Sequence, residues 1–321
     1  MKKIALPDLA EVFKITPTRK RLMIDYMAWV LLVILIIIGV SLKGSLFFSV
    51  SNLTNIIEQS AIIGVLAIGQ FVVVLTGGID LSVGANMALM AMVAGLTLPL
   101  GVFGSIGATL AAGAIIGMIA GLVVAYAEIP PFIVTFAMMA ICRGLALTVT
   151  KGEAVKNVNS PLQVIGFGPP HWLVWLGLAG LVWFLLTKTR TGTNIYAVGG
   201  NREAARVTGV NPKRILILVY VISGTCGAVA GILSMARYTV AMPTAGYGYE
   251  MQTIAAVVLG GISLFGGEGR FTGAIAGVIF VAMLRNILDA SNANPFWAYC
   301  VIGAVLWVAV ILRGLLERIR S

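Results

Sequence analysis

The sequence predicts an all-α, polytopic integral membrane protein, and three observations support this prediction. Of the 321 residues, 59% are hydrophobic and only 11% are charged, whereas a soluble globular domain has about 25% charged residues. The mean hydropathy is +1.01. Apolar runs follow one another along the whole chain, and a run of about 20 residues is enough to cross a bilayer core. We therefore expect about ten transmembrane helices joined by short loops.

The apolar runs between polar breaks give ten candidate spans. The first follows a polar segment of about 24 residues, so it reads as a retained span and not as a cleaved signal peptide. The eighth is short and bounded by glycines, which suggests a half-helix or re-entrant element shielded by protein or water. The predicted spans are 25–42, 53–77, 82–100, 104–127, 132–150, 171–187, 213–237, 250–263, 270–290 and 296–313.

The Lys and Arg residues predict the orientation of these spans. If the N-terminus is cytoplasmic, sixteen of the 22 basic residues fall on the cytoplasmic side and four on the outer side. This asymmetry satisfies the positive-inside rule, and it places both termini in the cytoplasm. The chain then divides into a cytoplasmic N-terminal segment (1–24), a transmembrane domain (25–313) with a cytoplasmic loop at 188–212, and a cytoplasmic tail (314–321).

Composition also argues against several kinds of site and partner. The net charge of +10 does not indicate nucleic-acid binding, because the basic residues lie at the ends of apolar runs and form no basic face with interleaved aromatics. The three cysteines lie inside apolar segments, as buried free thiols do, and His171 is the single histidine. We expect membrane lipid as a partner, no nucleic acid and no metal site.

A glycine-rich segment between the second and third spans reads Gly-Gly-Ile-Asp-Leu-Ser-Val-Gly. Its two leading glycines permit a sharp reversal at the inner end of a helix. Its Asp and Ser can cap the helix that follows, and for the Asp we favour a capping or interhelical role over direct contact with a substrate or partner. An acid near membrane depth is still a functional candidate. The residues singled out are Gly77, Gly78, Asp80, Ser82 and Gly84.

A second glycine-rich segment, 259–270, repeats the Gly-Gly-Ile-x-Leu core of the first. Four matching positions in this core are weak support for an internal repeat of the kind common in transporters. No Gly-Lys dipeptide occurs in the chain, so the segment is not a phosphate-binding loop of the Gly-Lys-Ser/Thr type. The residues singled out are Gly260, Gly261, Ser263, Gly266, Gly267 and Gly269.

The expected cytoplasmic loop contains the signals of one very short helix. Asn201 is a good N-cap, Glu203 lies in the first turn where the helix dipole favours an acid, and Gly209 suits a left-handed stop. Two turns of helix are unstable alone in water, so the rest of the protein or a partner must support them; the alternative is a solvated basic loop. The segment comprises Asn201, Arg202, Glu203, Ala204, Ala205, Arg206, Val207, Thr208 and Gly209.

Four segments occur in a characteristic order along the chain: Gly77–Gly84, a Pro-Pro-Phe-Ile-Val-Thr run (130–135) followed by Arg143-Gly144, Ala197–Gly209, and Gly260–Gly269. In this order they resemble the ribose-type permeases, the family of bacterial ATP-binding-cassette (ABC) importers for monosaccharides. The similarity extends from about residue 50 to the C-terminus. The sequence departs from the family pattern at Thr193, which follows Gly192 where the family usually has Arg. This difference affects one contact at the rim of the cytoplasmic loop and does not change the family assignment.

The resemblance implies the ten-helix fold of an ABC importer permease in the bacterial inner membrane. It also implies three protein partners: a cytoplasmic ABC ATPase that carries ATP and Mg²⁺, a periplasmic sugar-binding protein and a second permease copy. The short cytoplasmic helix of such permeases is the coupling helix, which docks in a groove of the ATPase. Here it corresponds to Asn201–Gly209, with Ala204 and Ala205 small enough for close docking and the charged residues at a polar rim. A neutral monosaccharide, a ribose-like pentose or related sugar, would be imported by alternating access with no cofactor and no catalysis in this chain.

Uncharged polar side chains within the spans can supply the hydrogen bonds that a sugar needs along its path. For any one of them, we favour interhelical hydrogen bonding over contact with the sugar. Arg143 lies inside the fifth span, where we expect it to face a polar interior or pair with an acid. The candidate path residues are Asn55, Gln59, Gln70, Asn86, Gln252 and Asn286.

Three other functions remain alternatives. An ion-coupled secondary transporter needs buried acids, for which Glu58, Asp80 and Glu128 are the candidates. An intramembrane hydrolase needs a nucleophile and base at membrane depth, but His171 lies at the outer edge of a span. An importer of branched-chain amino acids would use a distantly related permease, although the Gly-Gly-Ile-Asp-Leu-Ser segment favours the sugar importers.

Overall fold

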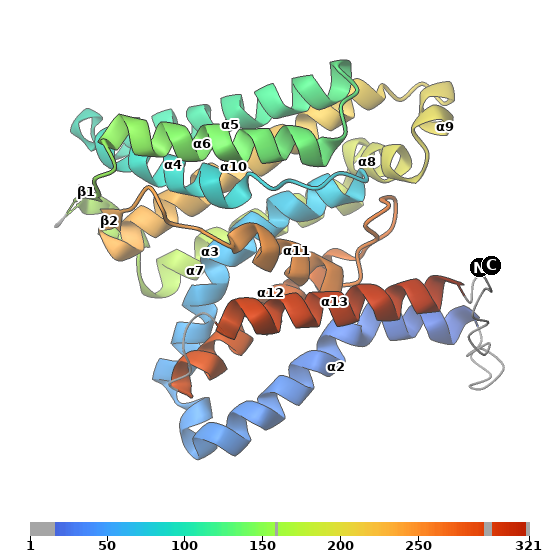
Figure 1. The fold of residues 1–321 in the computed structure, drawn as a ribbon, viewed down its shortest axis with the longest axis horizontal. Helices are drawn as coiled ribbons and strands as arrows, with labels where there is room; N and C mark the ends of the chain where they lie inside the picture. The colour runs from blue at the N-terminus through green and yellow to red at the C-terminus, as the bar shows by residue number, and fades with distance from the viewer. Residues whose placement is uncertain (1–16, 158–159, 292–296, 319–321) are drawn as a thin grey trace, which may run out of the picture.

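The computed structural model describes residues 17–157, 160–291 and 297–318. Helices dominate this part of the chain (Figure 1). Two short strands, β1 (Val155–Lys156) and β2 (Val240–Ala241), form an antiparallel pair at one end of the molecule, which we call the β end. The short helix α9 (Arg202–Val207) lies at the opposite end, which we call the α9 end.

Seven of the predicted spans are confirmed as helices long and apolar enough to cross a membrane. The tenth predicted span coincides with α13 (Trp297–Arg318). Helix α2 begins, and α13 ends, toward the α9 end (Figure 1). The seven are α2 (Pro17–Lys43, apolar from Ala28 on and continued by η1, Gly44–Phe48), α3 (Val50–Leu75), α5 (Val102–Tyr126), α6 (Pro131–Thr150), α7 (Gly168–Lys188), α10 (Pro212–Tyr238) and α12 (Phe271–Ala290).

The third and eighth predicted spans are shorter than a full crossing. Helix α4 (Val83–Leu96) has 14 residues and α11 (Tyr249–Leu259) has 11. At 1.5 Å per residue they are about 21 and 16 Å long, against a hydrocarbon core of about 30 Å. The prediction of a full third span at 82–100 was therefore wrong, whereas the expected short eighth helix is confirmed.

Non-helical backbone completes the passage of both short helices. Residues 76–82 run from the α9 end toward the middle of the molecule, where α4 begins, and residues 242–248 run from the β end to the start of α11 (Figure 1). The two starts meet: a methyl group on Gly84 would overlap the carbonyl oxygen of Gly246, and one on Gly246 would lie 2.7 Å from that of Gly84. The N-termini of two half-helices therefore converge inside the protein.

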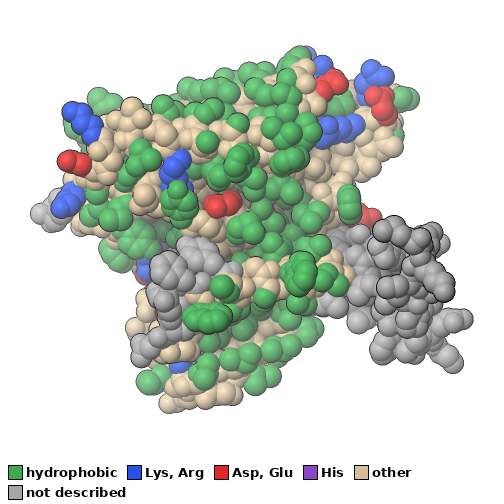
Figure 2. All heavy atoms as spheres, viewed as in Figure 1, with side chains coloured by type: hydrophobic (Ala, Val, Ile, Leu, Met, Phe, Trp, Pro, Cys, Tyr) green, Lys and Arg blue, Asp and Glu red, His purple; other side chains and the backbone are tan. Residues whose placement is uncertain are grey.

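Helix α10 is the centre of the packing and contacts α3, α4 and α5. Glycines recur every four residues on α5, at Gly113, Gly117 and Gly121, and a methyl group on Gly117 would overlap the carbonyl oxygen of Tyr220 on α10. Small residues at this spacing let two helix backbones approach closely within a membrane. The face shown in Figure 2 is broadly hydrophobic, as expected where a protein faces lipid.

Short elements connect the long helices. They comprise η2 (Leu98–Leu100), η3 (Pro161–Ile165) and α8 (Arg190–Gly200). Helix α8 leads directly into α9, so the predicted loop at 188–212 folds as two consecutive helices.

Candidate functional site: the glycine junction at the α9 end

Helix α9 confirms the short helix predicted from the sequence. The side-chain oxygen of Asn201 accepts a hydrogen bond from the Ala204 N–H at 2.9 Å, as an N-cap does. After the helix, Gly209 has φ +89°, and its N–H donates to the Arg206 carbonyl at 3.0 Å. The start and stop signals therefore act where the sequence placed them, with the helical residues confined to 202–207.

The two alanines of α9 face different environments, and the expected role of one was wrong. Ala205 is only 3% exposed and belongs to the hydrophobic core of this chain, so it is not available to a partner. Ala204 is exposed, and Val207 is 85% exposed. Glu203 and Arg206 form an exposed ion pair at 3.1 Å beside them. The surface that α9 offers to a partner is therefore Ala204 and Val207 with a charged rim.

The three glycine-rich segments found in the sequence meet in one place, which we call the glycine junction (Gly77, Gly199, Gly200, Gly266 and Gly267). The Gly267 N–H donates to the Leu75 carbonyl at the end of α3, at 2.9 Å. A methyl group on Gly199 would overlap that same carbonyl oxygen, and one on Gly266 would lie 2.7 Å from the Gly77 nitrogen. The backbones of these three segments can approach this closely only because glycine has no side chain.

Further bonds hold α8 and α9 to the junction. The Tyr196 hydroxyl donates to the Gly269 carbonyl at 3.0 Å. Burial raises the pKa of Tyr196 above its usual value, so the phenol keeps the proton that it donates. Arg202 donates a long bond of 3.5 Å to the Thr76 carbonyl. Helices α8 and α9 are thus tied to the α3–α4 and α11–α12 connections at the same time.

Asp80 has the interhelical role that the sequence favoured. Its Oδ1 accepts from the Ser82 N–H at 2.9 Å and from the Ser82 hydroxyl at 2.6 Å. Its Oδ2 accepts from the Ser223 hydroxyl of α10 at 2.6 Å. Ser82 occupies the N-cap position of α4, and we expected its side chain to cap a helix N–H. It does not do so and instead bonds to Asp80.

The other residues of the two motifs make turns and close packing. Gly77, Gly261, Gly266 and Gly267 have φ between +74° and +87°, which favours glycine. The Ser263 N–H donates to the Glu268 carbonyl at 2.8 Å. Methyl groups would lie within 3 Å of neighbouring atoms at the remaining positions, which are Gly78 (against Tyr220), Gly84 (against Glu250), Gly260 (against Ala274) and Gly269 (against Ile262).

A cavity of about 710 Å³ lies beside α9, between the end of α5 and the start of α10. It is lined by basic and acidic side chains together, namely Arg202, Arg206, Lys213, Glu128 and Glu203. Lys213 also lies over the Tyr126 ring at 4.7 Å. The cavity therefore places charged side chains around a hollow beside α9.

The six candidate path residues do not form one cluster. Asn286 accepts from Lys43 at 3.0 Å and Asn86 donates to the Gly224 carbonyl at 3.1 Å, so both bond between helices. Asn55 is exposed near the start of α3. In the described part of the chain, hydrogen bonds are lacking for buried atoms of Gln59 (Oε1), Gln70 (Nε2 and Oε1), Asn86 (Oδ1) and Gln252 (Oε1).

Arg143 bonds to backbone carbonyls and forms no ion pair with an acid in the described chain, so the acid pairing that the sequence suggested was wrong. Its Nη1 donates to the carbonyls of Pro243 and Ala245, both at 2.7 Å, and its guanidinium lies 4.4 Å from the Tyr247 ring centre. Sequence reasoning missed the 242–250 segment as a feature. Its signal was Gly246-Tyr247-Gly248, because glycines on both sides of a tyrosine indicate a break between helices.

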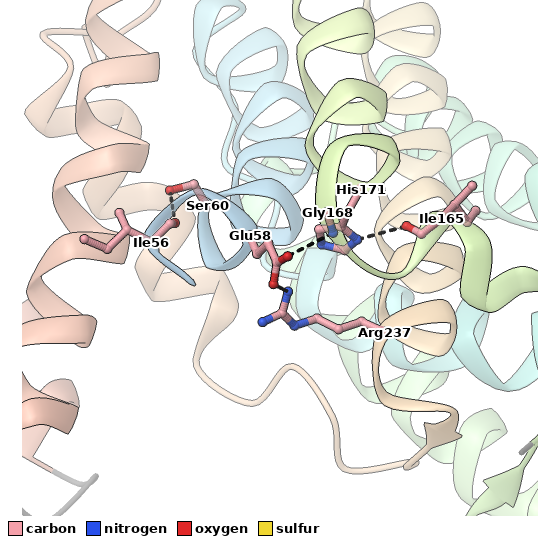
Figure 3. Close-up of polar contacts among 7 residues, drawn as sticks. All are labelled: Ile56, Glu58, Ser60, Ile165, Gly168, His171 and Arg237. Carbon is pink, nitrogen blue, oxygen red and sulfur yellow. Dashed lines mark hydrogen bonds and ion pairs between the residues drawn. The ribbon is translucent and has the colours of Figure 1, made fainter. Parts of the chain in front are cut away.

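At the β end, Glu58 is the centre of a buried polar network (Figure 3). Its carboxylate accepts from Arg237 of α10 at 2.6 Å and from the Gly168 N–H at the start of α7 at 2.9 Å. His171 bonds through Nδ1 to the Ile165 carbonyl at 3.1 Å. Glu58 is therefore part of an ion pair between helices.

Two half-helices that meet inside a bundle of long apolar helices define a polytopic membrane protein of the transporter class. Comparison with known proteins shows the family. The chain belongs to the family described as the branched-chain amino acid transport system permease component, and it matches this family over residues 52–310. No solved structure matches the chain.

The curated relatives cover most of the chain. The ribose import permease protein of Escherichia coli strain K12 is 38% identical over 296 residues, which are 88% of this chain and 92% of that protein. The ribose import permease protein of Bacillus subtilis strain 168 is 40% identical over 294 residues, 87% and 89% of the two chains. The fructose import permease protein of Rhizobium meliloti is 35% identical over 308 residues, 91% and 85% of the two chains.

Proposed function

We propose that this chain is the permease subunit of an ABC importer that carries a neutral monosaccharide, a ribose-like pentose or related sugar, across the bacterial inner membrane. The three relatives described above are named as sugar import permeases. The structural observation that carries the proposal is the glycine junction. There α8, which leads directly into the exposed short helix α9, is in contact with the connection before α4 and with the connection after α11.

In this proposal the α9 end faces the cytoplasm, both termini lie on that side, and ten helices with α4 and α11 as half-helices make up the membrane domain. The partners are an ABC ATPase with its ATP and Mg²⁺, a periplasmic sugar-binding protein and a second permease copy. Helix α9 is the coupling helix. Ala204 and Val207 contact the ATPase, with Glu203 and Arg206 at the rim and the adjacent cavity open to ATPase side chains.

The mechanism follows from what α8 touches. When the ATPases close on ATP, they displace α9, and α8 moves with it. Because Gly199 packs on Leu75 and Tyr196 bonds to Gly269, the displacement acts on residues 76–82 and 260–270 together. These connections set the positions of α4 and α11, so one motion at the α9 end shifts both half-helices. This chain moves helices and performs no covalent chemistry.

Two alternatives are less well supported. The family description names branched-chain amino acids, but the relatives that cover most of the chain are named for sugars. An ion-coupled transporter needs an acid able to bind an ion; Glu58 is engaged by Arg237, and both oxygens of Asp80 accept hydroxyl or N–H donors.

The test is reconstitution of the chain with a co-expressed ATPase and candidate binding proteins in proteoliposomes. We expect ATP-dependent uptake of radiolabelled D-ribose or a related sugar only when all the components are present. The purified chain alone should hydrolyse no ATP, because it lacks a Gly-Lys-Ser/Thr loop. Robust hydrolysis by the isolated chain, or uptake driven by a proton or sodium gradient without ATP, would refute the proposal.

A further inference from the structure

The segment at residues 242–248 is irregular backbone that passes deep into the protein. It leaves the β1–β2 pair at the β end and reaches the start of α11 near the middle of the molecule (Figure 1). Gly246 and Gly248 have φ +70° and +78°. Irregular backbone at membrane depth is tolerated only where protein buries it or where it lines a water-filled cavity. In this segment Met242, Thr244 and Tyr247 are exposed at the surface of the chain.

Arg143 holds this segment against α6. It lies seven residues before the end of α6 at Thr150, about 10 Å along the helix axis, in a hydrocarbon core of about 30 Å. Both of its hydrogen bonds within the described chain use Nη1. The N–H groups at Nε and Nη2 have no protein partner in that part of the chain, and the side chain is partly exposed.

Glu250 lies on the same face, in the first turn of α11. Its Oε1 accepts from the Gly248 N–H at 3.2 Å, and its Oε2 lies against the first turn of α4, 2.8 Å from where a methyl group on Gly84 would be. Glu250 and Arg143 do not form an ion pair with each other. Tyr247, 60% exposed, lies beside them.

Contact with lipid would be unfavourable for the charged side chains of Arg143 and Glu250. Figure 2 shows basic atoms over α6 and acidic atoms near the start of α11, within an otherwise hydrophobic stretch of this face. A charged side chain inside the membrane normally faces a bundle interior or a water-filled cavity, where it marks a substrate pathway. The partly exposed side chains of Arg143 and Glu250 are therefore in contact with water or with a solute.

We propose that Arg143, Tyr247 and Glu250 form the point in the translocation path where the sugar contacts this chain. The chemistry suits a neutral polyol. The guanidinium supplies donors and the carboxylate acceptors for sugar hydroxyls, and the exposed tyrosine ring can lie against the apolar C–H face of a pyranose or furanose. The site rests on the proposed function, and it differs from the six amide side chains that the sequence suggested as the path.

The first test is thiol accessibility in the assembled transporter, in a variant lacking Cys142, Cys226 and Cys300. Tyr247→Cys should react with a charged, water-soluble thiol reagent in nanodiscs, and D-ribose with its binding protein should slow the reaction. Ile141→Cys is the matched control, because two residues along α6 place it on the opposite side from Arg143 at nearly the same depth. Absence of labelling at 247, or labelling that the sugar does not slow, would overturn the proposal.

The second test is sugar selectivity. Tyr247→Ala and Glu250→Gln should change the ratio of D-ribose to D-fructose or D-galactose uptake at least about fivefold, since lost hydrogen bonds and stacking affect each sugar differently. Tyr247→Phe should retain the wild-type ratio, and so should Ile141→Ala. A purely structural role would lower all uptake rates together and leave the ratio unchanged, which contradicts the proposal. If the wild-type transporter imports none of these sugars, the proposed function is wrong. If it imports them but the variants keep the wild-type ratio, only the proposed sugar-contact site is wrong.

Discussion

Arg237 donates from Nη1 to Glu58 Oε2 at 2.6 Å, and this bond fastens α10 to α3 at the β end (Figure 3). The side chains are only 13% and 9% exposed. The second carboxylate oxygen accepts the Gly168 N–H, which adds the start of α7. One acid therefore links three helices at the end opposite α9. In the proposed mechanism, movement enters the fold at the other end, through α9.

Breaking this ion pair should destabilise the protein strongly. Removal of one partner of a buried pair costs about 3–5 kcal/mol, because the other charge is left uncompensated. Glu58→Gln and Arg237→Gln should each lower the thermal unfolding temperature of the purified chain, and the double variant should lose less than the sum of the two. Additive losses in this double-mutant cycle would mean that the two side chains do not act as a pair.

The glycine junction predicts opposite effects at two adjacent positions. A methyl group on Gly199 would overlap the Leu75 carbonyl oxygen, whereas one on Gly200 would meet no atom within 4 Å. Gly199→Ala should therefore separate α8 from the end of α3 and reduce ATP-driven sugar uptake at least about tenfold, a barrier change of about 1.4 kcal/mol. Gly200→Ala is the control and should retain uptake. Equal activity of both variants would show that the close contact does not transmit movement.

The features that sequence predicted well are local ones. Asn201 caps α9 because its side-chain oxygen lies next to an unpaired helix N–H, and Gly209 ends the helix because the stop needs positive φ. Asp80 was expected to bond between helices, and it does. Such features depend on a few neighbouring residues, so composition and spacing are enough to find them.

The features that sequence missed depend on tertiary contacts. Helix α4 is apolar on all sides because protein surrounds it, and a buried half-helix has the same apolar composition as a lipid-facing span. The inward orientation of Ala205 is set by the fold and not by its small size. The partners of Arg143 are backbone carbonyls, and a carbonyl is present at every position, so no residue type marks it.

The orientation predicted from the basic residues can be tested at the two ends of the molecule. Lys156 and Arg202 are both exposed, on β1 and on α9 respectively, and these elements lie at opposite ends (Figure 1). In a variant without the three native cysteines, Lys156→Cys should react with an impermeant maleimide on intact cells. Arg202→Cys should react only after permeabilisation. If both react on intact cells, the assignment of the α9 end to the cytoplasm is wrong.

The docking role of α9 depends on Val207. This residue is 85% exposed on a helix too short to be stable alone, and an exposed apolar side chain beside a charged rim is typical of a protein contact. Val207→Lys should replace that apolar contact with a charge and weaken retention of the ATPase at least about tenfold. Because a cation at a helix C-terminus is favourable, α9 itself should persist.

Val164→Lys is the matched control for Val207→Lys. Val164 is 73% exposed, and it lies on η3, between β1 and α7. The same substitution there should leave co-purification of the ATPase and sugar uptake unchanged. Ala205→Trp, in contrast, should lower the stability of the permease itself, because Ala205 is buried in its own core. If Val207→Lys retains the ATPase and imports sugar at wild-type rates while the chain is folded, α9 is not the coupling element, and the loop is a solvated surface.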